Sequence, residues 1–350
     1  MRGAGFRSSV YFPLAALVLL ATALTSISIG STSIELETVI RVLAGRILPE
    51  GWLSLSGITQ QDDIIVSQIR APRAVVAALA GAALAVAGAQ LQGLFRNPLA
   101  EPNVIGVSAG AALGAVIAFA TNLTAQSSFW IPLFSFGGAL VALFTVYSIA
   151  TRGGRTPIAT LLLAGIALGA LLSALSSLVI SLSFVNFQVA TEILFWMMGG
   201  LDSSRWLQVW ISMPFVAIGI IIALWFTRDL DLMLLGEETS ASLGVEVETV
   251  KRVILVTAAL LTGSAVAVSG MVAFVGLVVP HFVRLILGPS HRVLIPASAL
   301  AGAVFLIVCD ILARTLHPPL EIRLGVITAA FGAPFFLYLL RSRRKEAGYF

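Results

Sequence analysis

The sequence contains few residues that could carry out covalent chemistry. None of its three histidines, His281, His291 and His317, lies beside a second plausible metal ligand. Its single cysteine, Cys309, lies in an apolar run, which excludes an intramolecular disulfide and a thiolate metal cluster. The glycine-rich loop ending in Gly-Lys-Ser or Gly-Lys-Thr is absent, so the chain does not bind ATP through a P-loop. We therefore expect no catalytic residue, no metal site and no cofactor bound by this chain.

Charged residues that could recognise a partner are concentrated in the polar segment Arg228–Arg252. It holds six of the 17 acidic residues, and its apolar residues surround Gly236 and Gly244. This pattern predicts two short helices with glycine turns. A loop that is simply solvated is the plainer interpretation. Such a loop needs neither a Met-Leu-Leu core nor regularly spaced glycines, so we favour a docking element for a cytoplasmic partner.

Arginines form a second group of candidate residues. The polar segment Glu35–Arg73 ends in the string Arg70-Ala-Pro-Arg73. Asp310 lies four residues before Arg314, which is the spacing for an ion pair within one helix. We expect a structural role for Asp310, while Arg314 is still available to present its charge outward.

The composition shows where these residues must be positioned. The chain of 350 residues is 58% hydrophobic and 11% charged, with a mean hydropathy of +1.01. Globular proteins contain about 25% charged residues, and a soluble fold needs polar residues to cover its surface. The net charge of +4 does not indicate nucleic acid, because the basic residues are scattered between apolar runs without an aromatic-rich basic face. The chain is therefore expected to lie in a lipid bilayer.

Stretches without Asp, Glu, Lys or Arg mark the membrane segments, and a helical crossing needs about 20 residues. We predict an all-α membrane protein of about ten transmembrane helices. Breaks are expected near 121–128 and at Ser269–Gly270, and a short extra helix within Thr156–Thr191. The first run, Val10–Ile29, is longer than a signal-peptide core of roughly 7–15 residues, so we expect a retained helix. The runs are 8–34, 74–95, 102–151, 156–191, 206–227, 253–283, 293–309 and 324–340.

The distribution of basic residues predicts the orientation. With both termini in the cytoplasm, the predicted inner segments collect 14 of the 21 lysines and arginines and the outer segments collect the other seven. Cytoplasmic loops carry the excess of basic residues, so an N-in, C-in topology is predicted. Arg70, Arg73 and Arg314 then lie outside, and Arg228–Arg252 lies inside.

Several strings of the sequence resemble FecCD-type permeases, the membrane subunits of bacterial ABC importers for iron–siderophore complexes, haem and cobalamin. The resemblance extends from about Arg70 to Leu340. It is carried by RAPRAVVAALAGAALAVAGAQLQGLFRNPLAEPNVIGVSAGAALGA (Arg70–Ala115), FWMMGGL (Phe195–Leu201), LGEETSASLGV (Leu235–Val245), FVGLVVPHFVRLILGPSHR (Phe274–Arg292) and the stretch from Asp310 through Gly325 to Pro334.

The resemblance implies a type II importer permease, with residues 1–350 forming one transmembrane domain in the bacterial inner (plasma) membrane. It implies a second permease copy, in a homodimer or a pseudo-dimer, and a dimer of cytoplasmic ATPase subunits that binds ATP and magnesium. It also implies a periplasmic substrate-binding protein. The permease itself is then not an enzyme but moves its cargo by alternating access.

The same resemblance assigns roles to particular residues. It implies that Arg70, Arg73 and Arg314 dock the binding protein and that a coupling loop lies within about 228–252. It implies that Asn97, Leu99, Thr156 and Thr160 form an inner gate. Met197–Gly200 would belong to a short outer helix beside the entrance. The residues that the resemblance implies to contact the ATPase are Leu235, Gly236, Glu237, Glu238, Ala241, Leu243 and Gly244.

One string departs from the family pattern. Members usually have Glu-Leu-Pro-x-Gly or Glu-Ile-Pro-x-Gly before the final span, whereas this chain has Glu321-Ile-Arg323-Leu-Gly325. An arginine in place of the proline changes the outer rim and the expected docking of the binding protein.

The resulting hypothesis is an importer permease for a metal chelate. An iron–siderophore complex is the first expectation, followed by haem, and cobalamin is the alternative. An ion-coupled secondary transporter is a different possibility, which needs buried carboxylates within its spans. The apolar runs contain none. An integral membrane enzyme is disfavoured, because no cluster of histidines or acidic residues falls at membrane depth.

Overall fold

Helices dominate the computed structural model, which describes residues 2–30, 32–46, 48 and 57–346, without the side chains of residues 2–8, 339, 340 and 342–346. Apolar runs in a bilayer must satisfy their backbone polar groups internally, and helices do so. The predicted outer segment Glu35–Arg73 includes residues 47 and 49–56, which lie outside the described residues. Its remaining part forms α2 (Leu36–Gly45), α3 (Gln60–Ile64) and the π-helix η1 (Ile65–Arg70).

Seven helices of the described chain are long and apolar enough to cross a membrane. They are α1 (Arg2–Ser28), α4 (Ala71–Leu94, continuous with α3 and η1), α6 (Trp130–Ala150), α7 (Ile158–Ser183), α9 (Trp206–Trp225), α12 (Val247–Ser269) and α14 (His291–Thr315). Three shorter apolar helices, α5 (Val107–Ala120), α13 (Val275–Leu287) and α15 (Leu324–Glu346), occupy the predicted third, eighth and tenth crossings. The predicted all-α membrane fold with about ten crossings is confirmed.

The helix breaks fall where polar residues and glycines predicted them. The short helix η3 (Leu123–Ala125) separates α5 from α6, and α12 ends at Ser269 before Gly270, whose φ is 66°. The expected extra helix is α8 (Phe187–Met197), and η2 (Pro102–Ile105) precedes α5. Several helices extend beyond the predicted apolar runs: α8 continues past Thr191, α12 begins at Val247 rather than Val253, and α14 continues to Thr315, beyond the run that ends at Cys309. Asp310 and Arg314 therefore lie within the helix, where they pair with each other.

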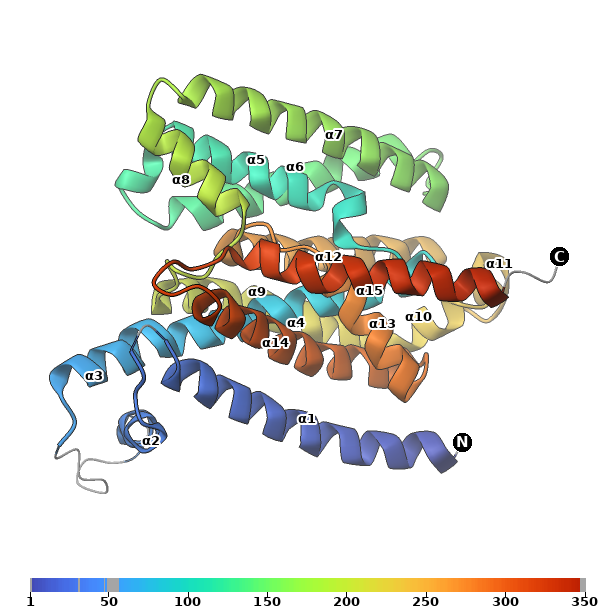
Figure 1. Ribbon diagram of the computed structural model, residues 1–350. Coiled ribbons are helices and arrows are strands. Elements are labelled where there is room, and N and C mark those ends of the chain that lie inside the picture. Colours follow the sequence, from blue (N-terminus) through green and yellow to red (C-terminus); the bar gives the residue numbers. More distant parts are fainter. Residues whose placement is uncertain (1, 31, 47, 49–56, 347–350) are drawn as a thin grey trace.

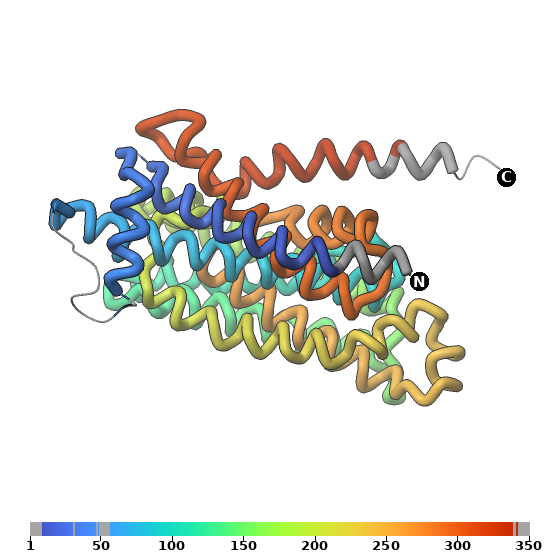
Figure 2. The backbone as a smooth tube through the Cα atoms, turned by 90° about the horizontal axis from the view of Figure 1, so that it is seen from below, coloured from blue at the N-terminus to red at the C-terminus, as the bar shows by residue number. Residues whose placement is uncertain are grey.

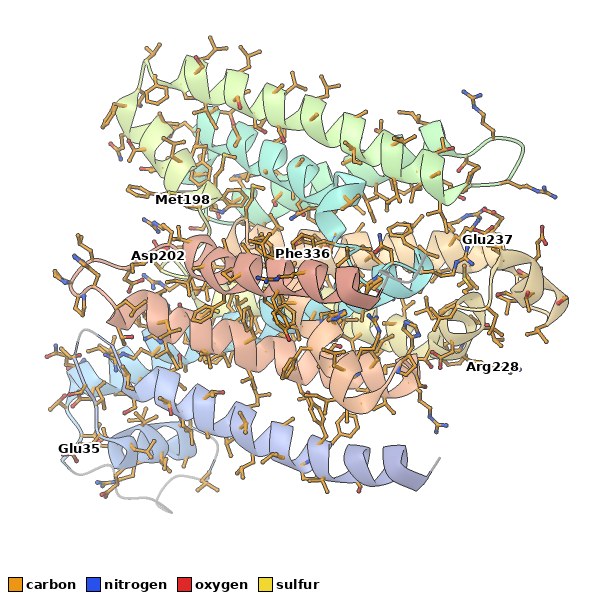
Figure 3. All side chains as sticks on the ribbon, turned by 45° about the vertical axis from the view of Figure 1, so that its right-hand side comes forward. Glu35, Met198, Asp202, Arg228, Glu237 and Phe336 are labelled. Atoms are coloured by element: carbon orange, nitrogen blue, oxygen red, sulfur yellow. The ribbon has the colours of Figure 1, made fainter. Side chains whose placement is uncertain are left out.

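The two ends of the bundle carry different elements. Both chain ends lie at the same end as α10 (Thr227–Met233) and α11 (Glu237–Ser242), whereas α2, α3 and α8 lie at the opposite end (Figures 1 and 2). The labelled side chains follow this division: Arg228 and Glu237 are at one end, and Glu35, Met198 and Asp202 are at the other (Figure 3). This arrangement agrees with the predicted N-in, C-in topology.

The helix α4 is the centre of the bundle. Twenty of its 24 residues are buried, and it packs against α14, α12, α13 and α9. The close packing depends on glycines that face each other: Gly81 lies against the backbone of Gly302 in α14, and Gly88 lies against the backbone of Gly276 in α13. Small residues permit such approach where no hydrophobic force drives helix association.

A methyl group at Gly88 tests this packing. Its Cβ would overlap the carbonyl oxygen of Gly276, so Gly88→Ala must separate α4 from α13. We expect a loss of about 1–3 kcal/mol of stability, as for other overpacked cores. The matched control is Gly137→Ala in α6, where a Cβ meets no atom within 4 Å.

Thermal unfolding in detergent can be followed with a fluorogenic maleimide, because Cys309 is buried and reacts only after unfolding. Equal unfolding temperatures for Gly88→Ala and Gly137→Ala would contradict the proposed backbone contact.

Candidate functional site

Arg73 is the centre of a buried ion network at the outer end of α4. Its Nε and Nη2 donate to Asp310 Oδ1 in α14 at 3.0 and 2.9 Å. Its Nη1 and Nη2 also donate to the two carboxylate oxygens of Glu321, at 3.1 and 2.7 Å. Glu321 belongs to the loop before α15, so one guanidinium joins three segments of the chain.

Arg314 and Arg70 hold the carboxyl-terminal end of α1. Arg314 Nε lies 3.1 Å from Asp310 Oδ2, and Nη1 donates to the carbonyl of Ile29 at 2.8 Å. Arg70 Nη1 donates to the carbonyl of Ser28 at 2.8 Å and also bonds the carbonyl of Ile27. The last carbonyls of a helix have no partner within it, and cations are favourable near this negative end. These two arginines therefore act as caps.

The structure corrects the expected exposure of these three arginines. Arg70, Arg73 and Arg314 are only 5, 8 and 8% exposed, so they do not present free charges outward. A guanidinium taken out of water must be paired and hydrogen-bonded, and partners inside the chain supply those bonds. The predicted Asp310–Arg314 pair is confirmed. Docking of a binding protein through these residues stays a prediction.

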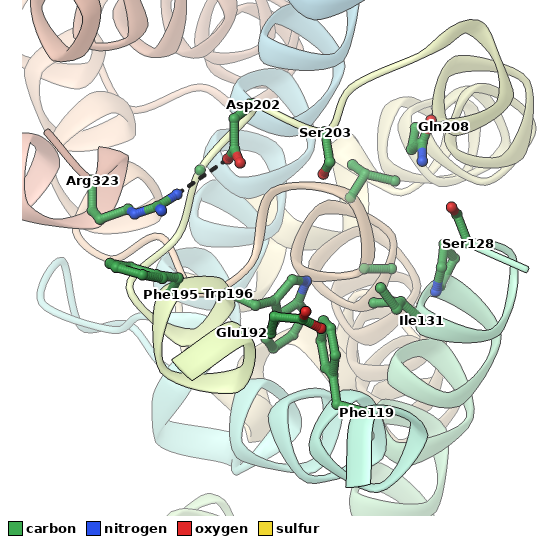
Figure 4. Close-up of a pocket in the computed structure, with 14 residues that line it drawn as sticks. Phe119, Ser128, Ile131, Glu192, Phe195, Trp196, Asp202, Ser203, Gln208 and Arg323 are labelled. Carbon is green, nitrogen blue, oxygen red and sulfur yellow. Dashed lines mark hydrogen bonds and ion pairs between the residues drawn. The ribbon is translucent and has the colours of Figure 1, made fainter. Parts of the chain in front are cut away.

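A pocket at the same end was not predicted from the sequence. It has a volume of about 330 Å³ and lies between α5, α6, α8, α9 and α12 (Figure 4). Arg323 lies at its edge, bonds Asp202 Oδ1 at 3.2 Å and covers the ring of Phe195 at 4.3 Å. The arginine that departs from the family string is therefore held by α8 and the loop after it. Gly200 lines the pocket, as a position beside an entrance would.

The cytoplasmic segment forms the two predicted short helices. Gly236 and Gly244 have φ values of 107° and 88°, which L-residues rarely adopt, and they flank α11. Leu235 and Leu243 are 60 and 53% exposed, so this element presents apolar side chains to the outside. Glu238 and Ala241 are also exposed. The structure thus confirms the predicted local fold, and its contact with an ATPase stays a prediction.

Asp231 fixes α10 to the start of α14. Its Oδ1 accepts the backbone N–H of His291 at 2.8 Å and lies 2.6 Å from His291 Nδ1, and its Oδ2 accepts from Ser290 Oγ at 3.0 Å. Burial acts to raise the pKa of Asp231, but the bonds from His291 and Ser290 hold this pKa below its usual value.

Of the residues predicted to form an inner gate, Asn97, Leu99 and Thr156 lie in two loops, and Thr160 lies in the first turn of α7 (Ile158–Ser183). Thr156 is buried, with its N–H bonded to Glu248 and its carbonyl bonded to Lys251, whereas Thr160 is exposed. In the other loop, Asn97 Oδ1 accepts the N–H of Leu99 at 3.0 Å. That loop continues into η2, which packs against α7, so both loops are attached to the same helix.

A carboxylate inside the protein supports the broken backbone before α13. Glu101 Oε1 accepts the N–H of Phe274 at 2.8 Å. Phe274 has a φ of 69°, a conformation that is rare for a non-glycine residue. The Glu101 oxygen thus satisfies the N–H of the residue that caps α13, a group that has no partner in the helix. Sequence patterns could not reveal this contact, because the two residues are separated by 173 positions.

This arrangement defines a class of protein. Helices that cross the membrane about ten times, with interrupted backbone at α12–α13 and the folded α10–α11 element at the cytoplasmic end, form a multi-pass membrane permease. The chain belongs to the FecCD transport family, which it matches over residues 18–342. It is therefore the transport subunit of an ABC importer in the inner membrane, and ATP hydrolysis belongs to a separate ATPase.

Known relatives match nearly the whole chain. It is 41% identical to the cobalamin import system permease protein BtuC of Halobacterium salinarum, over 99% of this chain and 100% of that one. It is 38% identical to the hemin transport system permease protein HmuU of Yersinia pestis, over 95 and 96% of the two chains. It is 39% identical to the Fe(3+)-citrate import system permease protein YfmD of Bacillus subtilis, over 81 and 83%.

A solved structure has the same fold. It shows an inward-facing conformation of a metal-chelate type ABC transporter and superposes with a TM-score of 0.82 at 29% identity, over 95% of this chain and 99% of that one.

The outer network predicts a strong effect of Asp310→Asn. The substitution leaves Arg73 and Arg314 buried without their shared counter-charge, and removal of one buried partner costs about 3–5 kcal/mol. The pair of exposed Asp202 and half-buried Arg323 is the control, because Asp202→Asn should change stability by less than about 1 kcal/mol. Both values come from thermal unfolding in detergent. Similar losses in the two variants would show that the Asp310 network is not the stronger interaction.

Asp231 predicts a pH dependence at the cytoplasmic end. The pKa of Asp231 is lower in the folded protein than in the unfolded chain. The stability that the ionised carboxylate contributes is therefore complete above the pKa of the unfolded chain, about 3.9, and is lost as the pH falls through the pKa of the folded protein. We expect Asp231→Asn to lose about 1 kcal/mol at neutral pH. The difference from the wild type should shrink as the pH falls below about 4. Asp229→Asn, at a neighbouring position without these bonds, serves as the control, and a pH-independent difference for Asp231→Asn would contradict the assignment.

Proposed function

We propose that this chain forms the membrane pathway of an importer that carries an intact metal chelate into the cytoplasm by alternating access. The observation that carries the proposal is the similarity, over 81–99% of this chain, to permeases for cobalamin, hemin and ferric citrate. All three cargoes are metal ions held by an organic ligand. The fold fits this role, because transport requires two access states and no bond-making residue.

The cargo candidates follow from the same relatives. Ferric siderophores and haem are the first candidates, as the sequence analysis expected. Cobalamin is the alternative candidate, and it is supported by the relative that matches over 99% of this chain and 100% of its own. The identities of 41, 39 and 38% are too similar to separate these cargoes, so the experiment must do so.

The partners in this proposal are an ATPase dimer, a substrate-binding protein and a second permease copy. The ATPase, which binds ATP and magnesium, contacts the α10–α11 element through exposed leucines such as Leu235. The binding protein docks at the outer end, above the Arg73 network. Because Arg70, Arg73 and Arg314 are bonded inside the chain, a docking contact with Arg73 requires the loop that carries Glu321 to move.

Reconstitution tests this function. The permease is co-expressed with the ATPase and binding protein encoded beside it and placed in proteoliposomes, and uptake of a ferric siderophore, haem and cobalamin is measured in turn. We expect ATP-dependent uptake of one of them. Uptake that follows a proton or sodium gradient, without an ATPase subunit in the purified complex, would instead establish an ion-coupled secondary transporter.

A substitution at the docking element refines the test. Leu235→Asp places a charge on an exposed apolar contact, so the ATPase should no longer co-purify while the permease remains folded. Leu36→Asp is the matched control, because Leu36 is an exposed leucine at the opposite end, in α2. Retention of the ATPase by Leu235→Asp would exclude this leucine from the contact.

A further inference from the structure

The side chain of Lys251 connects three segments at the cytoplasmic end. Its side chain is 3% exposed, and its Nζ lies 2.7 Å from Glu237 Oε2 in α11 and 3.1 Å from Glu248 Oε1 in the first turn of α12. The same Nζ donates to the carbonyl of Thr156 at 3.1 Å. Thr156 lies between α6 and α7, about a hundred positions before Lys251 in the chain, so no local pattern predicts this contact.

Thr156 is held through all of its polar groups. Its N–H donates to Glu248 Oε2 at 3.1 Å, its carbonyl accepts from Lys251, and its hydroxyl lies 2.9 Å from that of Thr151. Glu248 therefore bonds Lys251 with one oxygen and Thr156 with the other. The position of the Thr156 backbone is thereby tied to the two side chains of α12.

The segment that contains Thr156 is a short closed turn. Arg152 and Arg155 exchange backbone hydrogen bonds at 3.0 and 3.1 Å, and Gly153 and Gly154 have φ values of 58° and 76°. The helix α7 begins at Ile158, two residues after Thr156. A displacement of Thr156 is therefore passed directly to the first turn of α7.

We infer that Lys251 is a positioning residue that transmits movement of α11 to the segment Thr151–Thr156 and so to α7. A buried ammonium group that loses a partner is strongly unfavourable. When α11 moves, Glu237 must therefore draw Lys251 and Thr156 along or leave the charge less well paired. This inference rests on the proposed function, because it needs an ATPase to move α11.

Distance measurements in the complete complex test the inference. Spin labels are attached in a Cys309→Ala background, and each pair shares a label at Arg292, which is exposed at the start of α14. The pair Thr239/Arg292 reports movement of α11, and the pair Arg155/Arg292 reports movement of the turn. Distances are measured by electron double resonance without nucleotide and after trapping with Mg-ATP and vanadate.

In the wild type both distances should shift on trapping. In Lys251→Met the α11 shift should persist while the shift of the turn is lost, and Lys251→Arg should restore it. Glu237→Ala removes only the α11 partner at a half-exposed position, so it should show the same separation with little risk to folding. The matched control is Arg252→Met, because Arg252 is the exposed neighbour of Lys251 and its Nε donates to Tyr147 Oη at 3.2 Å.

The outcomes separate the inference from the proposed function. A complex without an ATPase overturns both. A wild-type complex that holds the ATPase but shows no shift of the turn overturns the inference and leaves the proposed function standing. If the wild type shifts but Glu237→Ala or folded Lys251→Met still moves the turn, the inference is wrong and the proposed function stands. Loss of both shifts in Lys251→Met and in Glu237→Ala would show a merely structural role and also overturn it.

Discussion

Contact between helix backbones at α4 is the constraint on which the centre of the bundle and its outer ion network depend. Gly81 and Gly88 lie against Gly302 and Gly276, so α4 approaches α14 and α13 without intervening side chains. This approach brings Arg73, on α4, within bonding distance of Asp310 on α14. In a bilayer, packing of small residues replaces the hydrophobic force that would hold helices together in water. The outer ion network is therefore positioned by residues that have no polar side chain.

The two ends use buried cations differently. At the outer end, Arg73 and Arg314 share Asp310, and their remaining bonds go to a loop carboxylate and to the backbone of α1. At the cytoplasmic end, Lys251 bonds two carboxylates and one carbonyl from segments with different positions in the chain. A guanidinium forms bonds in a fixed planar fork, whereas an ammonium group is a compact charge on a flexible stem. The outer network thus favours a fixed geometry, whereas the inner one can keep its bonds while the segments that it joins move together.

Local features were predictable from the sequence, and contacts between distant segments were not. Gly236 and Gly244 marked the turns around α11, and the spacing of Asp310 and Arg314 marked their ion pair. Resemblance to the family assigned outward arginines, but it could not show that Arg73 faces Asp310, 237 positions away. Hydropathy identifies a span without revealing which neighbour each face meets. For the same reason, the pocket beside Phe195 and the contacts of Lys251 required the structure.

The attachment of α1 has a consequence for how the protein is made. Only 11% of the apolar stretch of α1, within Ser9–Ser28, is buried inside the protein. The carbonyls at the carboxyl-terminal end of α1 are bonded by Arg70 and Arg314. Arg314 lies 285 positions after the carbonyl of Ile29 that it bonds. Because synthesis proceeds from α1 towards α14, the bonds from Arg70 can form early, whereas the bond from Arg314 forms only when α14 has been inserted. The attachment of α1 is thus completed in two stages that are separated by most of the synthesis of the chain.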